Sequence, residues 1–149
     1  MRSRILLVMS LAACLALVPA TGAQAAKTRT LTGSLHMAII GNNGDTGRVF
    51  AGELLGTPIP RSAVILRNKV EGSTSTGVAV VYAKRGTIRA RVVNEIQPQP
   101  DGSASLPGTF RVLGGTGAYK GATGSGSFTG TLPANSTIFE VELEGKIRY

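Results

Sequence analysis

The sequence predicts an all-β fold, an eight-stranded antiparallel β-barrel. Three observations support this prediction. Apolar and polar residues alternate along short segments, a pattern typical of strands with one buried face. Gly, Pro, Asn and Asp separate these segments at short intervals, and no segment after residue 25 has the apolar period of an amphipathic helix. Eight antiparallel strands can close on themselves, which leaves no exposed sheet edge.

The N-terminal segment 1–25 has the pattern of a secretory signal peptide. Arg2 and Arg4 precede an apolar run at 5–18, and the small-residue sequence Ala-Gln-Ala at 23–25 provides a cleavage site. We therefore expect cleavage after residue 25 and a secreted or otherwise extracytoplasmic protein. No later segment has the ~20 apolar residues that a membrane-spanning helix needs.

A second interpretation of the same segment stays open. The sequence Leu11-Ala12-Ala13-Cys14 resembles a bacterial lipobox, in which Cys14 would be lipidated and would become the new N-terminus. The protein would then be a lipoprotein anchored through Cys14. Removal of 25 residues from the chain of 149 leaves 124, so residues 26–149 are expected to form a single domain.

The composition limits the chemistry of the mature chain. Cys14 is the one cysteine, so its loss with the signal leaves no disulfide, no thiol nucleophile and no cysteine metal site. The net charge of +8 falls to about +6 when Arg2 and Arg4 are removed. Such a surface attracts anionic partners, among them membrane or envelope polymers. Export makes nucleic acid the least expected partner.

Eight strands are expected, at 28–40, 48–55, 61–70, 78–84, 87–96, 109–113, 127–132 and 137–149. The first is half-buried, because an apolar set alternates with Thr30, Thr32, Ser34 and His36: Leu31, Leu35, Met37 and Ile39. The second follows a turn at 41–47, and its facing is ambiguous because both of its faces carry apolar residues. The third follows the segment 56–60 and places Val64, Leu66 and Val70 on one side.

The fourth and fifth strands flank the short connection Lys84-Arg85-Gly86, which is a hairpin signal. In the fourth strand Val78, Val80 and Tyr82 share a face that is expected to point inward. In the fifth, Ile88, Ala90 and Val92 are opposed by Arg89, Arg91 and Glu95. A polar loop is expected at 97–107.

The remaining strands surround a glycine-rich segment. The sixth strand leads into it and the seventh leaves it. The last strand alternates most regularly, with Phe139, Val141, Leu143, Ile147 and Tyr149 on one face and Glu140, Glu142, Glu144, Lys146 and Arg148 on the other.

The glycine-rich segment 114–128, GGTGAYKGATGSGSF, contains six glycines. A phosphate-binding loop would need a lysine and a Ser or Thr after its last glycine and then a helix. Gly121 is instead followed by Ala122-Thr123 and a strand pattern, so nucleotide binding is not expected. Gly114-Gly115-Thr116-Gly117 is predicted to form a tight corner, and Gly121 and Gly124 to permit bends in a curled sheet.

The segment FRVLGGTGAYKGATGSG at 110–126 resembles the signature of the dirigent and allene oxide cyclase superfamily. The hairpin at 80–93 and the closing strand at 138–147 are similar to the family's pattern in order. The resemblance implies an eight-stranded, calycin-like barrel, a homotrimer, and an apolar cavity for a small hydrophobic molecule. It also implies activity without a cofactor, either cyclisation of a fatty-acid epoxide or steering of phenoxy-radical coupling. The family's glutamate on the first strand has no counterpart in LHMAII at 35–40.

Four residues are candidates for contact with a ligand. Asn68 and Asn94 fall on apolar strand faces, where an amide either bonds to nearby backbone or orients a ligand. Tyr82 either offers its hydroxyl to a cavity or is plain core. Glu53 would become a general acid or base with a raised pKa if it pointed inward.

The other polar residues suggest no catalytic site. His36 is the only histidine, which is too few ligands for a metal site, and no Ser-His-acid set is recognisable. An outward basic set could contact an anionic envelope or membrane surface: Arg61, Arg67, Lys69, Arg85, Arg89, Arg91 and Arg111. Three hypotheses follow: a binding barrel for a hydrophobic molecule, possessing or lacking a steering activity; a cofactor-independent cyclase or isomerase that uses Glu53; and a basic envelope-associated module.

Overall fold

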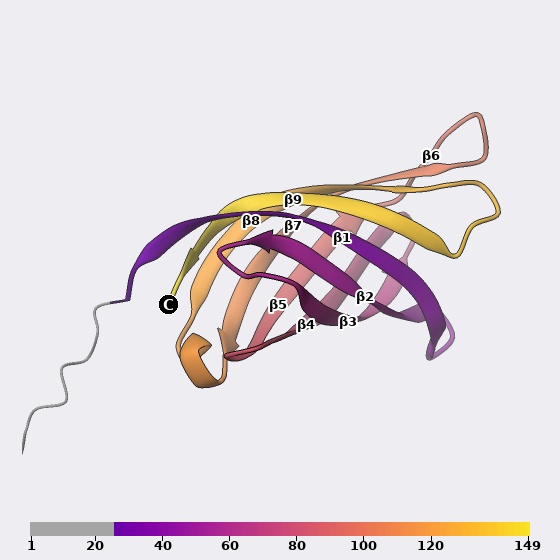
Figure 1. The fold of residues 1–149 in the computed structure, drawn as a ribbon. Helices are drawn as coiled ribbons and strands as arrows, with labels where there is room; N and C mark the ends of the chain where they lie inside the picture. Colours follow the sequence, from indigo (N-terminus) through magenta and orange to yellow (C-terminus); the bar gives the residue numbers. More distant parts are fainter. Residues whose placement is uncertain (1–25) are drawn as a thin grey trace, which may run out of the picture.

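The computed structural model describes residues 26–149, and the expected signal peptide and Cys14 lie outside the described residues. The described chain forms one antiparallel sheet that curls round on itself (Figure 1). Within residues 26–149, no helix is both long enough and apolar enough to cross a membrane.

The sheet contains nine strands: β1 (Thr28–Asn43), β2 (Gly47–Thr57), β3 (Ser62–Glu71), β4 (Thr74–Ala83), β5 (Gly86–Glu95), β6 (Gln97–Pro98), β7 (Ala104–Gly115), β8 (Thr123–Leu132) and β9 (Ile138–Arg148). Their order is β5-β4-β3-β2-β1-β9-β8-β7-β6, and β5 also pairs with β7. This last pairing closes eight strands into a barrel and leaves the two-residue β6 outside it. The predicted fold class is therefore confirmed.

Five strands are longer than expected, namely β1, β2, β4, β7 and β8, most clearly β7, whereas β3 and β5 shift by one residue and β9 is shorter by one residue at each end. The first residues of β7 lie in the expected loop 97–107, where Pro107 and several small polar residues suggested a turn. Pro107 is tolerated because it pairs with Thr129 of β8, whereas the pairing of β7 with β5 begins only at Gly108. A proline has no N–H to donate, so it fits where one side of a strand has no partner.

Alternation predicts the inward face correctly on four strands. The residues expected inside β1, β3, β5 and β9 line the barrel interior or pack in its core. The expectation for β4 is wrong by one residue, because Ala79 and Val81 line the interior while Tyr82 is 50% exposed. Both faces of this strand carry apolar residues, so the pattern contained no signal for the choice.

The glycine-rich segment forms the corner between β7 and β8. It contains a single turn of 3₁₀-helix, η1 (Gly117–Tyr119), and is held to the β4–β5 turn by a bond of 2.9 Å from the Ala118 N–H to the Arg85 carbonyl. Gly114, Gly117 and Gly121 have φ values of 132°, 60° and 72°, which side chains disfavour.

The two ends of the barrel differ. At the end where β1 begins and β9 finishes, Ile59, Tyr119 and Ala122 are each 2% exposed and cover the interior. We call this the closed end. At the other end, where β1 finishes and β9 begins, the inward residues Ile39, Leu106 and others are only half-buried. We call this the open end.

Candidate functional site

The barrel encloses a cavity of about 280 Å³. All eight barrel strands contribute to its lining, which is almost entirely apolar. The aromatic members include Phe50 and Phe139, whose rings meet edge to face at 5.5 Å. The other large apolar lining residues are Leu31, Leu35, Met37, Ile39, Leu54, Ile59, Val64, Leu66, Val70, Val81, Ile88, Val92, Ile96, Leu106, Phe110, Val112, Phe128, Leu132, Val141, Leu143 and Ile147.

Glycines on the inner face of the wall explain where the large side chains pack. Gly126 of β8 and Gly145 of β9 are paired with each other, and the Phe110 ring lies over them. A Cβ atom at residue 126 would come within 2.6 Å of that ring, and one at residue 145 within 2.9 Å. The ring therefore packs directly against backbone at the wall of the barrel.

Aromatic packing also seals the closed end. Tyr119 of η1 contacts Tyr149 edge to face, with ring centroids 4.9 Å apart, and the Arg29 guanidinium lies 5.1 Å from the Tyr149 ring centre. Burial raises the pKa of the Tyr119 hydroxyl above its usual value. Access to the cavity is therefore through the open end.

A polar rim lies at the open end on one side of the mouth. It consists of Arg48 of β2, Asn68 of β3, Ser75 of β4 and Asn94 of β5. The opposite side of the mouth is apolar, with Ile39, Leu106 and Leu132 from β1, β7 and β8. A ligand that enters here meets hydrogen-bonding groups on one side and hydrocarbon on the other.

Asn68 is buried, and both the oxygen and the nitrogen of its side chain form hydrogen bonds within the protein. Its Nδ2 donates to Ser75 Oγ at 2.8 Å, and its Oδ1 accepts from the Arg48 backbone N–H at 2.8 Å. Its own carbonyl accepts from Asn43 Nδ2 at 2.8 Å. Asn68 therefore ties β2 to β4 across β3 and fixes the position of the rim.

Asn94 and Arg48 are less constrained. The half-buried Asn94 lies opposite Ser75 in the β4–β5 register, and its Nδ2 makes one long bond of 3.3 Å to the Glu95 carbonyl. Arg48 Nη1 donates to the Gly47 carbonyl at 2.9 Å, and no carboxylate within residues 26–149 forms an ion pair with this guanidinium. Both side chains have hydrogen-bonding capacity available to a ligand.

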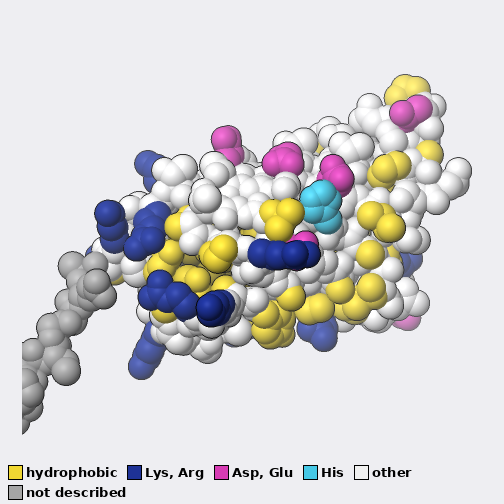
Figure 2. All heavy atoms as spheres, in the orientation of Figure 1, with side chains coloured by type: hydrophobic (Ala, Val, Ile, Leu, Met, Phe, Trp, Pro, Cys, Tyr) yellow, Lys and Arg dark blue, Asp and Glu magenta, His cyan; other side chains and the backbone are white. Residues whose placement is uncertain are grey.

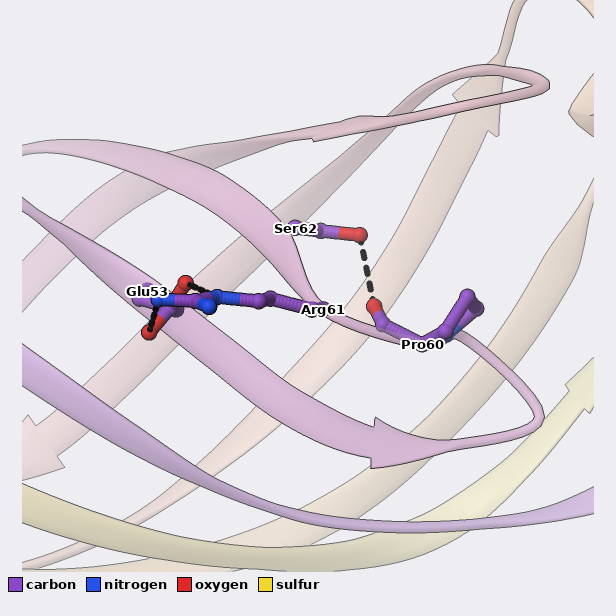
Figure 3. Close-up of polar contacts among 4 residues, drawn as sticks. All are labelled: Glu53, Pro60, Arg61 and Ser62. Carbon is purple, nitrogen blue, oxygen red and sulfur yellow. Dashed lines mark hydrogen bonds and ion pairs between the residues drawn. The ribbon is translucent and has the colours of Figure 1, made fainter.

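Two of the sequence-predicted residues are not at the cavity. Tyr82 projects from the outer face, so the interpretation in which its hydroxyl reaches a ligand is wrong. Glu53 also points outward, where it forms an ion pair with Arg61 of the β2–β3 loop; Figure 3 shows the two side chains directed toward each other beside the Ser62–Pro60 hydrogen bond. The alternation of β2 places Phe50 and Leu54 inside, and Glu53 is then outside.

The electrostatics of Glu53 are the reverse of those of an internal acid. The hydrogen bond from Arg61 lowers the pKa of the Glu53 carboxyl below its ordinary value of 4.5. A general acid that works near neutral pH needs a raised pKa. Position and pKa together correct the hypothesis that Glu53 is an acid or base for a bound ligand, and none of the residues described as lining the cavity is a carboxylate.

The remaining polar candidates lie on the outer surface. His36 Nδ1 is 3.2 Å from Glu140 Oε1, and the members of the expected basic set are all exposed. Within residues 26–149, no group of three or more His, Cys, Asp or Glu side chains is placed to hold a metal ion.

Sequence reasoning missed Arg48 and Ser75. Arg48 has the same parity as Phe50 and Leu54, and Ser75 the same parity as Ala79 and Val81, so a correct choice of face on β2 and β4 would have found both. Comparisons with protein-family models, with characterised proteins and with solved structures found no match to the chain.

Proposed function

We propose that this protein is an exported binding barrel that encloses one small hydrophobic molecule and, by shape alone, steers how that molecule cyclises or couples. The observation that supports this most directly is the apolar cavity of about 280 Å³ with a polar rim on one side of its mouth. Binding sites for small molecules typically combine an apolar lining with a few placed polar groups.

The cavity volume limits the size of the ligand. An engineered cavity of ~150 Å³ in another protein holds benzene. A cavity of about 280 Å³ therefore suits a molecule of roughly a dozen non-hydrogen atoms. At about 0.6 kcal/mol for each of these atoms, the affinity is expected to lie in the micromolar range.

The lining also limits the chemistry. Among the described residues that line the cavity there is no His, Asp, Glu, Lys or Tyr side chain to act as a general acid or base. A steering activity would therefore act by holding a molecule that reacts unaided in one of its conformations. The closed eight-stranded barrel is the architecture that the dirigent and allene oxide cyclase resemblance implies, and it supports keeping that resemblance as a proposal.

The test begins with the protein purified from its own host. Native mass spectrometry and solvent extraction should reveal a reproducible small hydrophobic adduct. Separately, 2-naphthol serves as a probe, because its size fits the cavity and its hydroxyl can reach the polar rim. We expect the adduct to be present, and 2-naphthol to bind with micromolar affinity and to raise the Tm.

Two phenylalanine substitutions on adjacent residues of β4 provide the control. Ala79→Phe places a ring inside the cavity, whereas Val80→Phe places the same ring on the outer face. Ala79→Phe should lower both adduct content and 2-naphthol affinity at least tenfold, and Val80→Phe should change neither. A mass equal to that of the protein alone, together with no 2-naphthol binding by the wild type, would refute the proposal. Equal 2-naphthol binding by the two variants would also refute it.

A further inference from the structure

Positively charged side chains gather at the closed end of the barrel. Seven exposed residues come from the strand ends and turns there: Lys27, Arg29, Arg61, Lys84, Arg85, Lys120 and Arg148. Figure 2 shows Lys and Arg side chains around a hydrophobic patch at the end where the described chain starts and finishes. Arg29 and Arg85 both lie close enough to Tyr119 to lower the pKa of its hydroxyl, although burial outweighs them.

The acidic residues lie mostly elsewhere. Five are in the turns and strand ends of the open end or in its projecting loop: Asp45, Glu71, Glu95, Asp101 and Glu140. Glu142 and Glu144 follow along the middle of β9, and Glu53 is paired with Arg61. The charge is therefore separated along the barrel axis, with the positive side at the closed end.

The cations of the closed end are largely uncompensated. Within residues 26–149 the ion pairs are those of Glu53 with Arg61 and of Glu140 with His36. The remaining six cations of this end therefore keep their charge available. These cations come from several turns and strand ends spread around the closed end, and they do not converge on a pocket. They therefore suit an extended anionic surface better than a single small anion.

Apolar side chains surround the same end. Leu55, Tyr82 and Leu113 are 40%, 50% and 51% exposed, and each lies within two residues of the last residue of its strand at the closed end. The open end also exposes apolar side chains, with Ile40 at 60% and Ile138 at 62%, so the closed end is distinguished by apolar side chains that lie among a cluster of uncompensated cations. A soluble polyanion would make little use of exposed hydrocarbon. A bilayer with anionic lipids uses both features, because basic groups contact its headgroups while Leu and Tyr enter the interfacial layer.

We propose that the closed end of the barrel docks on a lipid bilayer that contains anionic phospholipid. The open end carries five acidic residues against the cations Arg48 and Lys69, so the same surface attracts it less than the closed end, and the barrel stands with the mouth of its cavity directed away from the bilayer. This inference does not depend on whether the cavity is occupied, so Ala79→Phe should bind to the bilayer as the wild type does.

The first experiment compares two clusters of equal charge. The exported protein is sedimented with vesicles of phosphatidylglycerol and phosphatidylcholine, and with vesicles of phosphatidylcholine alone. The closed-end variant carries Lys84→Glu, Arg85→Glu and Lys120→Glu, and the wall variant carries Arg67→Glu, Arg91→Glu and Arg111→Glu on the outer faces of β3, β5 and β7. Circular dichroism and Tm establish that both variants are folded.

We expect the wild type to bind the mixed vesicles and not the phosphatidylcholine vesicles. The closed-end variant should bind the mixed vesicles at least tenfold more weakly than the wild type, and the affinity of the wall variant should fall much less. Equal losses would show that only net charge matters and would overturn the inference. Binding to soluble polyglutamate as strong as to the mixed vesicles would also overturn it, in favour of a polyanion partner.

The second experiment reports orientation. The chain contains no tryptophan, so a single introduced tryptophan is an unambiguous probe. Leu113→Trp places it at the closed end and Ile138→Trp, at a residue 62% exposed, places it at the open end. With mixed vesicles, the emission of Leu113→Trp should shift to shorter wavelength and that of Ile138→Trp should not. The opposite result, or a shift in both, would contradict docking through the closed end.

Discussion

At the scale of the residue, the two asparagines both lie at the polar rim, but Asn68 forms more hydrogen bonds within the protein than Asn94 does. Alternation along β3 and β5 was sufficient to predict that Asn68 and Asn94 face inward. It could not predict that the amide of Asn68 bonds to the backbone of β2 and to Ser75 of β4, because those partners come from strands whose facing was undetermined. Hydrogen-bond satisfaction depends on register across strands, which a single segment does not encode.

Asn68→Ala should destabilise the protein, and Asn94→Ala should not. The first change leaves the Arg48 N–H and the Ser75 hydroxyl without their partner near the mouth of the cavity, so the free energy of unfolding should fall by about 2 kcal/mol. The second removes one long bond and should cost less than about 0.5 kcal/mol. Urea unfolding measures both, and equal losses would show that Asn68 has no special structural role.

The ion pair of Glu53 predicts a specific dependence of stability on pH. Because the pKa of Glu53 is lower in the folded state, its contribution is present above the unfolded-state pKa and is lost as the pH falls through the folded-state pKa. Glu53→Gln should therefore lower the Tm slightly at neutral pH, by no more than about 2 °C, and this difference should vanish in acid.

Thermal melts from neutral to acid pH measure this difference. Glu142→Gln is the matched control, since it removes an outer-face carboxylate of β9 for which residues 26–149 provide no ion pair. Affinity for 2-naphthol should be the same in Glu53→Gln as in the wild type. A clear loss of affinity would contradict the outward placement of this carboxylate.

At the scale of the element, the clarity of the alternation decided which strands could be predicted. β1 and β9 have one apolar and one polar face, and both were predicted correctly. β2 and β4 carry apolar residues on both faces, for example Leu54 beside Leu55 and Val81 beside Tyr82, so their facing depends on pairing with neighbours. In the structure, the register of β1 against β2 and of β3 against β4 determines which face of β2 and of β4 points inward.

The inner face of β8 provides the element-scale prediction. Gly126→Ala would drive a Cβ into the Glu144 carbonyl and against the Phe110 ring, so it should lower the free energy of unfolding by about 2 kcal/mol or more. Gly41→Ala is the control, because a Cβ at Gly41 meets no atom within 4 Å. Chemical denaturation compares the two variants, and a neutral Gly126→Ala would show that the wall is not tightly packed there.

At the scale of the whole molecule, the strand pattern of the sequence predicts a closed barrel. A cavity was expected only from the family resemblance, and the separation of charge between the two ends was not predicted. The number of strands and their alternation are local properties, so they can be read along the chain. The packing of the interior depends on contacts between strands that are not adjacent in the sequence, such as the Phe110 ring of β7 against Gly126 of β8 and Gly145 of β9. The charge separation depends on which turns meet at one end, such as the β4–β5 turn and η1, and these are far apart in sequence.

The pairing of the first strand with the last governs when this molecule can form. β9 lies between β8 and β1, so the barrel lacks one strand until β9 has been made. A chain that emerges from a ribosome or a translocation channel starting at its N-terminus therefore cannot complete the native structure early. β1 can pair with β2 at once, but its second partner, β9, is made only about a hundred residues later. Premature folding, which would block passage through a narrow channel, is thus disfavoured by topology itself. The cost is that the edge of β1 opposite β2 stays unpaired and must be protected from other chains until β9 has been made.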